Sequence, residues 1–287
     1  MTERPARIRF TLEDVRRRAV KPRDSWWTVF LVDPLAVPLS LVTANHTSLT
    51  PNQLTVLSFG AGLAASWFFW IGTTGALIAG AILFYVSFTL DCVDGKIARL
   101  KGTGSPFGEW FDYVLDRIRV LIATVALMAG QFRLTDDERF LYLALLVIFL
   151  DMLRYLDALK LQSLQQSMRA QVREAKRQMG LPLDEGDVEP GRGEEDQIQR
   201  GVATRFGRLR RIRDALDRRR VRSHMISGIE FQMFVFVLGP VTGQVEQLVY
   251  TASALLLVFE GALVVKLWLA TKEVRRTLFR IRAGGAP

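Results

Sequence analysis

Apolar runs of about twenty residues recur along this chain of 287 residues, and they limit its fold more than any other feature. Hydrophobic residues make up 49% of the sequence, but they are gathered into long stretches and not mixed with polar residues at short period. A helix of about twenty residues covers the ~30 Å hydrocarbon core of a bilayer and satisfies its own backbone polar groups. The sequence therefore predicts an all-α, polytopic membrane protein.

We expect six transmembrane helices, preceded by an amino-terminal helix in the membrane interface. The predicted spans are residues 52–71, 74–99, 107–130, 138–159, 225–242 and 246–270. Residues 34–47 are apolar, but Pro34 and Pro38 interrupt them and they are too short to span, so we expect an in-plane helix there. The charged segment Met1–Arg23 contains no apolar core, so the sequence predicts no cleavable signal peptide.

The distribution of lysine and arginine predicts the orientation in the membrane. The formal net charge is +9, and the basic segments are the amino-terminal arm, Lys96–Lys101, residues 160–222 and Lys272–Arg282. The opposite loops carry only Arg133 and Arg139. By the positive-inside rule the basic segments face the cytoplasm, so we expect a multi-pass protein of the cell inner membrane in contact with anionic lipid. No surface aromatics are interleaved with this charge, so nucleic acid is not an expected partner.

These features divide the chain into four parts. They are a cytoplasmic and interfacial arm (1–48), transmembrane helices 1 to 4 (49–160), a cytoplasmic helical insert (161–222), and transmembrane helices 5 and 6 with a basic tail (223–287). Within the insert we expect a helix over Leu161–Met179, an acidic loop over Gly180–Asp196 and an Arg-rich helix over Ile198–Arg222. The insert is either a lipid-contacting appendage or a lid or subunit contact near the site.

Four aspartates lie at helical spacing on both sides of one short turn. Asp91 and Asp94 are three residues apart and Asp112 and Asp116 are four apart, so each pair lies on one helix face. The Gly/Pro-containing turn at 100–106 makes the two helices antiparallel neighbours, which brings the four carboxylates into one cleft. An ionised carboxylate at membrane depth costs about 2.5–3.5 kcal/mol on insertion scales. Four that close repel one another strongly unless cations intervene.

Two divalent ions would neutralise this cluster. Ligands that are all oxygens favour hard cations, so Mg²⁺ or Mn²⁺ is expected, with Ca²⁺ left open. Two such ions suit phosphoryl-type transfer, because they clamp phosphate oxygens. Gly95, Ala98 and Gly108 are small enough for a ligand or a neighbouring helix to approach the backbone. Arg99 lies on the cytoplasmic side, where a pyrophosphate would bind.

This motif resembles the signature of the CDP-alcohol phosphotransferases, also called CDP-alcohol phosphatidyltransferases. That pattern is Asp-x-x-Asp-Gly-x-x-Ala-Arg, eight residues, then Gly-x-x-x-Asp-x-x-x-Asp. Every fixed position is matched, by Asp91, Asp94, Gly95, Ala98, Arg99, Gly108, Asp112 and Asp116. The segment Thr50–Thr55 also resembles the opening of the family's first span. The resemblance covers residues 50–130 well and extends loosely to six spans, but it does not cover the arm or the insert.

The resemblance implies an enzyme that transfers a substituted phosphate from a CDP-linked donor to a hydroxyl acceptor and releases CMP. Asp91, Asp94 and Asp112 would hold the two ions, with Asp116 touching one of them. Asp116 would also be the general base that deprotonates the acceptor. The residues assigned to the nucleotide pocket are Gly95, Ala98, Arg99, Gly108, Asn52 and Thr55. The resemblance also implies a homodimer.

The substrates stay open at this point. CDP-diacylglycerol is the expected donor, because the site opens at a membrane. Inositol phosphate, glycerol phosphate, serine or another polyol is the acceptor, and a phosphorylated polyol is preferred. Its phosphate would bind Arg117, Arg119 and Arg154, although these arginines can equally pair with carboxylates.

Three alternatives accompany this hypothesis. The first is a CDP-polyol donor with a polyol or lipid acceptor. The second is a divalent-cation transporter, which would spread its carboxylates across the membrane depth and not gather them at one face. The third is a non-catalytic scaffold with a structural metal site. The presence of Asp116 argues against that, since a scaffold needs no base.

Overall fold

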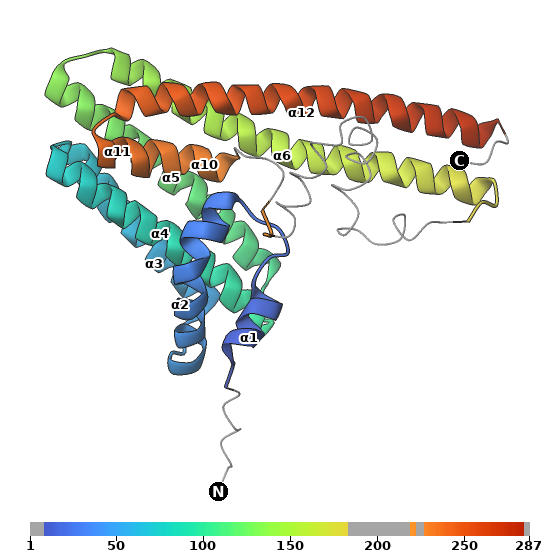
Figure 1. Ribbon diagram of the computed structural model, residues 1–287, viewed down its shortest axis with the longest axis horizontal. Coiled ribbons are helices and arrows are strands. Elements are labelled where there is room, and N and C mark those ends of the chain that lie inside the picture. The colour runs from blue at the N-terminus through green and yellow to red at the C-terminus, as the bar shows by residue number, and fades with distance from the viewer. Residues whose placement is uncertain (1–8, 183–218, 222–226, 284–287) are drawn as a thin grey trace, which may run out of the picture. The chain divides into compact units, whose positions relative to one another are not determined.

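The computed structural model describes residues 9–182, 219–221 and 227–283, and every regular element in these ranges is a helix (Figure 1). The predicted all-α class is confirmed. One isolated backbone bridge joins Asp24 to Val221. The chain forms two compact units, Met1–Leu150 with Arg220–Leu256, and Asp151–Arg219 with Leu257–Pro287.

The amino-terminal arm of the first unit folds into short helical segments. These are α1 (Leu12–Asp14), η1 (Val15–Ala19), η2 (Thr28–Val32) and α2 (Asp33–His46), of which η1 and η2 are π-helical. The arm is attached to α2 by reciprocal hydrogen bonds, from the Phe10 amide to Asn45 Oδ1 (2.9 Å) and from Asn45 Nδ2 to the Phe10 carbonyl (3.0 Å). Val15, Ala19 and Leu100 share one buried apolar cluster. The arm therefore packs against the carboxyl end of the helix that contains Leu100.

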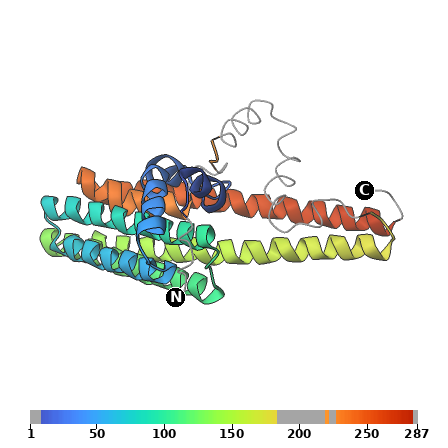
Figure 2. The same ribbon diagram turned by 90° about the horizontal axis from the view of Figure 1, so that it is seen from below.

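Three long helices follow: α3 (Pro51–Ile71), α4 (Thr74–Lys101) and α5 (Pro106–Thr135). Helix α3 begins with Thr50 as its N-cap and Pro51 in its first turn. Helix α4 ends at Gly102, whose φ of 64° is left-handed and favours glycine. Helix α3 packs against both α4 and α5, and Figures 1 and 2 show α3 and α4 side by side.

Close packing holds these helices together. A Cβ added at Gly80 would lie 2.6 Å from the Phe69 ring, so glycine lets α3 and α4 approach each other here. The rings of Phe69, Phe84 and Phe236 form a buried triad with centroid separations of 6.4, 6.3 and 4.6 Å. Phe236 belongs to η3, so this triad also joins the carboxyl-terminal part of the first unit to α3 and α4.

The remaining helices are α6 (Arg139–Gln178), α10 (Gly228–Met233), η3 (Phe234–Leu238), α11 (Gly239–Thr242) and α12 (Val245–Arg282). Helices α10 and α11 continue into each other through the π-helical η3. In the first unit, Arg139 at the start of α6 bonds to Asp137 and to Glu246 of α12. In the second unit, Thr271 of α12 lies beside Met168 of α6.

Four helical stretches are long and apolar enough to cross a membrane: Thr28–His46, Pro51–Ile71, Thr74–Lys101 and Val245–Arg282. A shorter apolar helix covers Gly228–Thr242. The membrane character of the fold agrees with the sequence, whereas the number of six spans stays a prediction. The first stretch is longer than the expected 34–47, because Pro34 occupies the first turn of α2 and the helix continues back through η2 to Thr28.

The insert is described only in part. The helix expected over Leu161–Met179 is present as the continuation of α6 to Gln178. The loop expected over Gly180–Asp196 and the helix expected over Ile198–Arg222 lie almost entirely outside the described residues.

Candidate active site

Three of the four motif aspartates converge. One carboxylate oxygen from each of Asp91, Asp112 and Asp116 lies within 4.8 Å of the other two. Asp91 belongs to α4 and the other two belong to α5, so the turn between the helices brings them together. That turn ends with Ser105, whose Oγ accepts a hydrogen bond from the Gly108 amide (3.0 Å) and begins α5.

Asp94 lies beside this group and not within it. Its side chain is buried, and Thr55 Oγ1 of α3 donates a hydrogen bond of 2.5 Å to Asp94 Oδ2. The same hydroxyl lies 3.1 Å from the carbonyl of Pro51. Thr55 was predicted to line the nucleotide pocket, and in the structure its hydroxyl fixes the orientation of a motif carboxylate.

Arg119 joins the carboxylates to the surrounding helices. It is 3% exposed, and its Nη2 contacts Asp116 Oδ1 at 2.5 Å. Its Nη1 lies 2.7 Å from Ser58 Oγ, 3.1 Å from Ser87 Oγ and 3.4 Å from Asp91 Oδ1. The guanidinium thus bridges α3, α4 and α5. Arg119 was expected either to bind the acceptor phosphate or to pair with carboxylates. In the structure it contacts Asp91 and Asp116, as expected for carboxylate pairing.

The cluster fits a hard divalent cation. Asp112 Oδ1 is buried and makes no hydrogen bond, although a buried carboxylate oxygen normally requires a partner. Three carboxylates close to one arginine leave a surplus of negative charge. Oxygen donors with this charge are the ligands that Mg²⁺ and Mn²⁺ prefer.

The small motif residues make room for polar side chains. A Cβ at Gly108 would lie 2.9 Å from Asn52 Oδ1, and a Cβ at Gly95 would lie 3.3 Å from Arg99 Nη1. Arg99 also donates from Nε to the carbonyl of Ala19 in the arm (2.7 Å). Ala98 lies across the turn, its Cβ 3.9 Å from the Cβ position of Gly104. The nucleotide-binding role of these residues stays a prediction.

The other two predicted acceptor residues lie in different units. Arg117 follows Asp116 on α5 and is half-buried. Arg154 belongs to the second unit, where its Nη1 lies 3.5 Å from Glu260 Oε1 and its guanidinium lies 5.1 Å from the Phe259 ring centroid. These contacts are those of a paired charge, the second of the two roles considered for Arg154.

A buried ion pair next to the motif was missed from the sequence. Lys96 Nζ lies 2.9 Å from Asp33 Oδ1, and the two residues are 4% and 8% exposed. Arg220 Nη2 lies 3.4 Å from the other oxygen of Asp33. The available signal was an aspartate at the edge of the apolar stretch at 34–47, because such a charge at a membrane boundary requires a partner.

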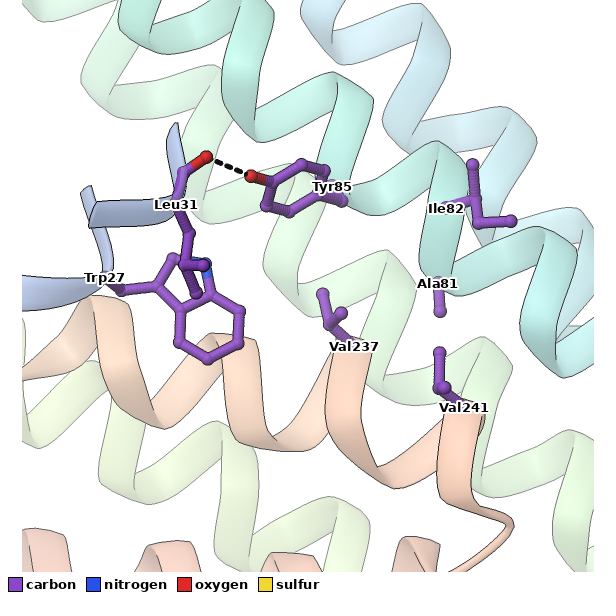
Figure 3. Close-up of a pocket in the computed structure, with 7 residues that line it drawn as sticks. All are labelled: Trp27, Leu31, Ala81, Ile82, Tyr85, Val237 and Val241. Carbon is purple, nitrogen blue, oxygen red and sulfur yellow. Dashed lines mark hydrogen bonds between the residues drawn. The ribbon is translucent and has the colours of Figure 1, made fainter. Parts of the chain in front are cut away.

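An apolar groove of about 270 Å³ lies between η2, α4, η3 and α11 (Figure 3). It is lined by Trp27, Leu31, Ala81, Ile82, Tyr85, Val237 and Val241. The Tyr85 hydroxyl donates to the Leu31 carbonyl at 2.6 Å, so the polar tip of this residue is satisfied by the backbone. Tyr85 precedes Asp91 by six residues on α4, roughly 9 Å along the helix axis.

Similarity to known proteins agrees with this geometry. Residues 48–179 match the family model described as CDP-alcohol phosphatidyltransferase. An archaetidylinositol phosphate synthase of Pyrococcus horikoshii is 41% identical over 76 residues, which are 26% of this chain and 39% of the relative. A phosphatidylinositol phosphate synthase of Corynebacterium glutamicum is 42% identical over 69 residues, which are 24% of this chain and 31% of the relative. The chain thus spans less than half the length of these relatives.

A crystal structure of a Mycobacterium tuberculosis phosphatidylinositol phosphate synthase covers 82% of this chain and 95% of its own, with 20% identity and a TM-score of 0.37. The match to the family model contains the four motif aspartates, and it confirms the resemblance seen in the sequence. The chain therefore contains, over residues 48–179, a domain of the CDP-alcohol phosphatidyltransferase family.

Proposed function

We propose that this protein is a membrane CDP-alcohol phosphotransferase, which moves a substituted phosphate from a CDP-linked donor to a hydroxyl acceptor and releases CMP. The observation that carries the proposal is the convergence of Asp91, Asp112 and Asp116 within a fully matched family motif. Three converging carboxylates favour the chemistry of a charged phosphate group. The apolar groove that includes Tyr85, six residues before Asp91 on α4, favours a lipid-linked substrate.

Two Mg²⁺ or Mn²⁺ ions are proposed to bind Asp91, Asp94, Asp112 and Asp116. When bound, such ions offset the charge of the phosphate oxygens and polarise the phosphorus centre. The buried, unbonded Asp112 Oδ1 supports this assignment. Thr55 and Arg119 would keep the carboxylates oriented whether or not substrate is present.

Asp116 is proposed as the general base. The acceptor hydroxyl oxygen forms a bond to the β-phosphorus, and the bond between that phosphorus and the bridging oxygen of CMP breaks. CMP leaves with the bonding electron pair, and the hydroxyl proton passes to the Asp116 carboxylate. The contact with Arg119 Nη2 fixes one oxygen of Asp116, which orients the carboxylate for this transfer.

The donor is proposed to be CDP-diacylglycerol. The lining side chains of the groove are apolar except for the Tyr85 hydroxyl, which donates to a carbonyl, and the indole nitrogen of Trp27. Part of this lining lies on α4, the helix that contains Asp91. An acyl chain would bury its apolar surface there while the pyrophosphate reaches the carboxylate end of α4. A CDP-polyol donor with a polyol or lipid acceptor is the alternative, and with a polyol acceptor it would leave this groove unused.

The acceptor is proposed to be inositol phosphate or another polyol phosphate. The Pyrococcus relative is named an archaetidylinositol phosphate synthase and the Corynebacterium relative a phosphatidylinositol phosphate synthase, which supports an inositol phosphate acceptor. A cytoplasm-facing site in the inner membrane, contact with anionic lipid and a homodimer are also proposed, from the charge distribution and the family resemblance. A divalent-cation transporter is less favoured, because the described carboxylates of the motif gather around one turn.

The test is CMP release by the purified protein in phosphatidylcholine vesicles that contain CDP-diacylglycerol and Mg²⁺. Inositol phosphate, glycerol phosphate, inositol and serine are supplied in turn, and the highest rate is expected with a phosphorylated polyol. Asp116→Asn should bind the donor and release no CMP. Asp136→Asn is the matched control, since Asp136 lies exposed at the other end of α5 with a φ of 54° that asparagine tolerates. Normal turnover by Asp116→Asn would exclude the base assignment.

A further inference from the structure

Trp27, on the arm that precedes the family match, has a buried hydrogen-bond donor without an acceptor. The side chain is 5% exposed, and its Nε1 makes no hydrogen bond to any of the described residues. A buried indole N–H group normally has a partner. The missing acceptor therefore points to a molecule that binds beside this side chain.

This side chain lines the apolar groove between η2, α4, η3 and α11 (Figure 3). The groove has a buried part and an open part. Trp27 and Ala81 are buried, whereas Leu31, Ile82 and Val241 are exposed apolar side chains. All of these residues belong to helical stretches that are apolar enough to lie in a membrane or directly precede one. The open part of the groove would then face the acyl chains of a lipid.

The other polar group in the groove is already paired. The Tyr85 hydroxyl donates its single proton to the Leu31 carbonyl at 2.6 Å. Figure 3 shows the indole nitrogen on the edge of the Trp27 ring that is turned towards Leu31 and Tyr85. Among the described lining side chains, Trp27 thus supplies the N–H group that is left for a ligand.

The surroundings of this donor select a neutral acceptor. A phosphate oxygen is charged, and burying a charge among apolar side chains without a counter-ion is costly. The methylene groups of an acyl chain contain no acceptor. An acyl ester carbonyl is neutral, accepts a hydrogen bond, and is attached to a chain whose apolar surface the groove can bury.

The position of Trp27 along the groove agrees with such a carbonyl. Of the lining residues on α4, Tyr85 is closest to Asp91, and Ala81 is a further four residues away, about 6 Å along the helix axis. In Figure 3 Trp27 lies at the end of the groove with Tyr85, and Ala81 and Val241 lie at the other end. The ester groups of a lipid lie between its phosphate and its acyl chains. An ester carbonyl is therefore expected at the Tyr85 end, with the chain directed towards Ala81.

We propose that Trp27 Nε1 donates a hydrogen bond to an ester carbonyl of the lipid-linked donor, and that this bond makes the protein select ester-linked over ether-linked donors. The inference rests on the proposed function and names a specificity-determining residue for it. Trp27 lies outside residues 48–179, which match the family model. It contacts no reacting atom, so its effect belongs to the KM of the donor and not to kcat.

The test compares CDP-diacylglycerol with its dialkyl ether analogue, which has the same chains but no carbonyl. Both are supplied with Mg²⁺ and inositol phosphate in vesicles of dialkyl ether phosphatidylcholine, so that the donor is the only source of ester carbonyls. The KM of the wild type should be about 2- to 10-fold lower for the ester donor, as expected for one neutral hydrogen bond. Trp27→Phe keeps an aromatic ring and removes the N–H group. It should lose this preference and use the ether donor as the wild type does.

Trp67→Phe is the matched control, because it makes the same change on α3 at a side chain that is 65% exposed. It should keep the preference of the wild type for the ester donor. The proposal is overturned if the wild type has no preference or if Trp27→Phe retains it. An equal rise in KM for both donors would assign Trp27 to packing alone. An effect of Trp27→Phe that appears only in vesicles of ester-linked phosphatidylcholine would assign the N–H group to a bilayer lipid, and it would also overturn the proposal.

A measurement without turnover keeps this inference separate from the proposed function. In detergent, diacylglycerol should raise the thermal unfolding temperature of the wild type more than dialkylglycerol of the same chain length. The two lipids should have equal effects on Trp27→Phe. If the wild type released no CMP but this difference were present, the proposed reaction would be wrong and the ester site would stand. If CMP release were normal and Trp27→Phe kept the difference, the proposed function would stand and Trp27 would not be the ester-binding residue.

Discussion

Arg119 Nη2 lies 2.5 Å from Asp116 Oδ1, one turn away on α5, and this contact joins the proposed base to the centre of the helix bundle. The same guanidinium lies 2.7 Å from Ser58 Oγ and 3.4 Å from Asp91 Oδ1. Few substitutions in the chain should affect both the fold and the site as directly as a change of this residue.

Arg119→Met should lower both stability and activity. Removing one partner from a buried ion pair costs about 3–5 kcal/mol, because the other charge stays buried and unpaired. We expect a clear fall in thermal unfolding temperature in detergent and a loss of CMP release. Arg133→Met is the control on the same helix, since Arg133 is exposed and donates to the carbonyls of Trp70 and Ile71. It should retain CMP release, and equal losses in both variants would remove the special role of Arg119.

Gly62→Ala on α3 should displace the side chain of Arg119. A Cβ at this position would lie 2.5 Å from Arg119 Cδ and 3.2 Å from Ser87 Oγ, so the arginine would have to shift. Gly60→Ala offers a matched comparison two residues away on α3, where no atom lies within 4 Å of the added Cβ. We expect lower CMP release for the first variant and wild-type release for the second. The rate of CMP release is measured for both variants at the same saturating concentrations of donor and acceptor.

Thr55→Val should weaken the affinity of the site for Mg²⁺ without unfolding the protein. The change keeps the shape of the side chain but removes the hydrogen bond to Asp94 Oδ2. A bond to a charged acceptor contributes about 1.5–3 kcal/mol, so the Mg²⁺ concentration for half-maximal CMP release should rise roughly 10- to 100-fold. Thr55→Ser keeps the hydroxyl and should stay near the wild type. An unchanged Mg²⁺ dependence in Thr55→Val would count against a metal at Asp94.

The sequence predicts the helices of this site well, because the signals are local. The cap at Thr50, the turn before Ser105 and the spacing of Asp112 and Asp116 are all read within one or two helical turns. The short turn between α4 and α5 then keeps the carboxylates of the two helices close, although α3 is the helix that packs against both of them. The extent of the first apolar helix was harder to predict, since Pro34 interrupts a helix only when it lies beyond the first turn.

The partners of the carboxylates could not be predicted in the same way. Arg119 was open to two roles, and the choice depends on Ser58 and Ser87, which are 61 and 32 residues away in sequence. The pair of Asp33 and Lys96 likewise depends on how the arm packs on α4. Spacing within one helix contains no information on such contacts, so they appear only when the helices are assembled.

Metal removal should abolish CMP release reversibly. A chelator such as EDTA takes away the cations that the aspartate cluster is proposed to hold, and four unneutralised carboxylates repel a pyrophosphate. Addition of Mg²⁺ or Mn²⁺ should restore the rate more fully than Zn²⁺, because all the proposed ligands are oxygens. Full activity after exhaustive chelation would show that the cluster needs no divalent ion.

The ion pair between Asp33 and Lys96 should be revealed by a double-mutant cycle on stability. Both residues are buried, so Asp33→Asn and Lys96→Met should each leave an uncompensated charge and lower the unfolding temperature. The double variant removes both charges and should be more stable than the sum of the single losses predicts. Because Arg220 also contacts Asp33, Asp33→Asn should cost more than Lys96→Met, since it leaves two cations without their carboxylate. Additive losses in the cycle would show that the arm and the motif helix are not coupled through this pair.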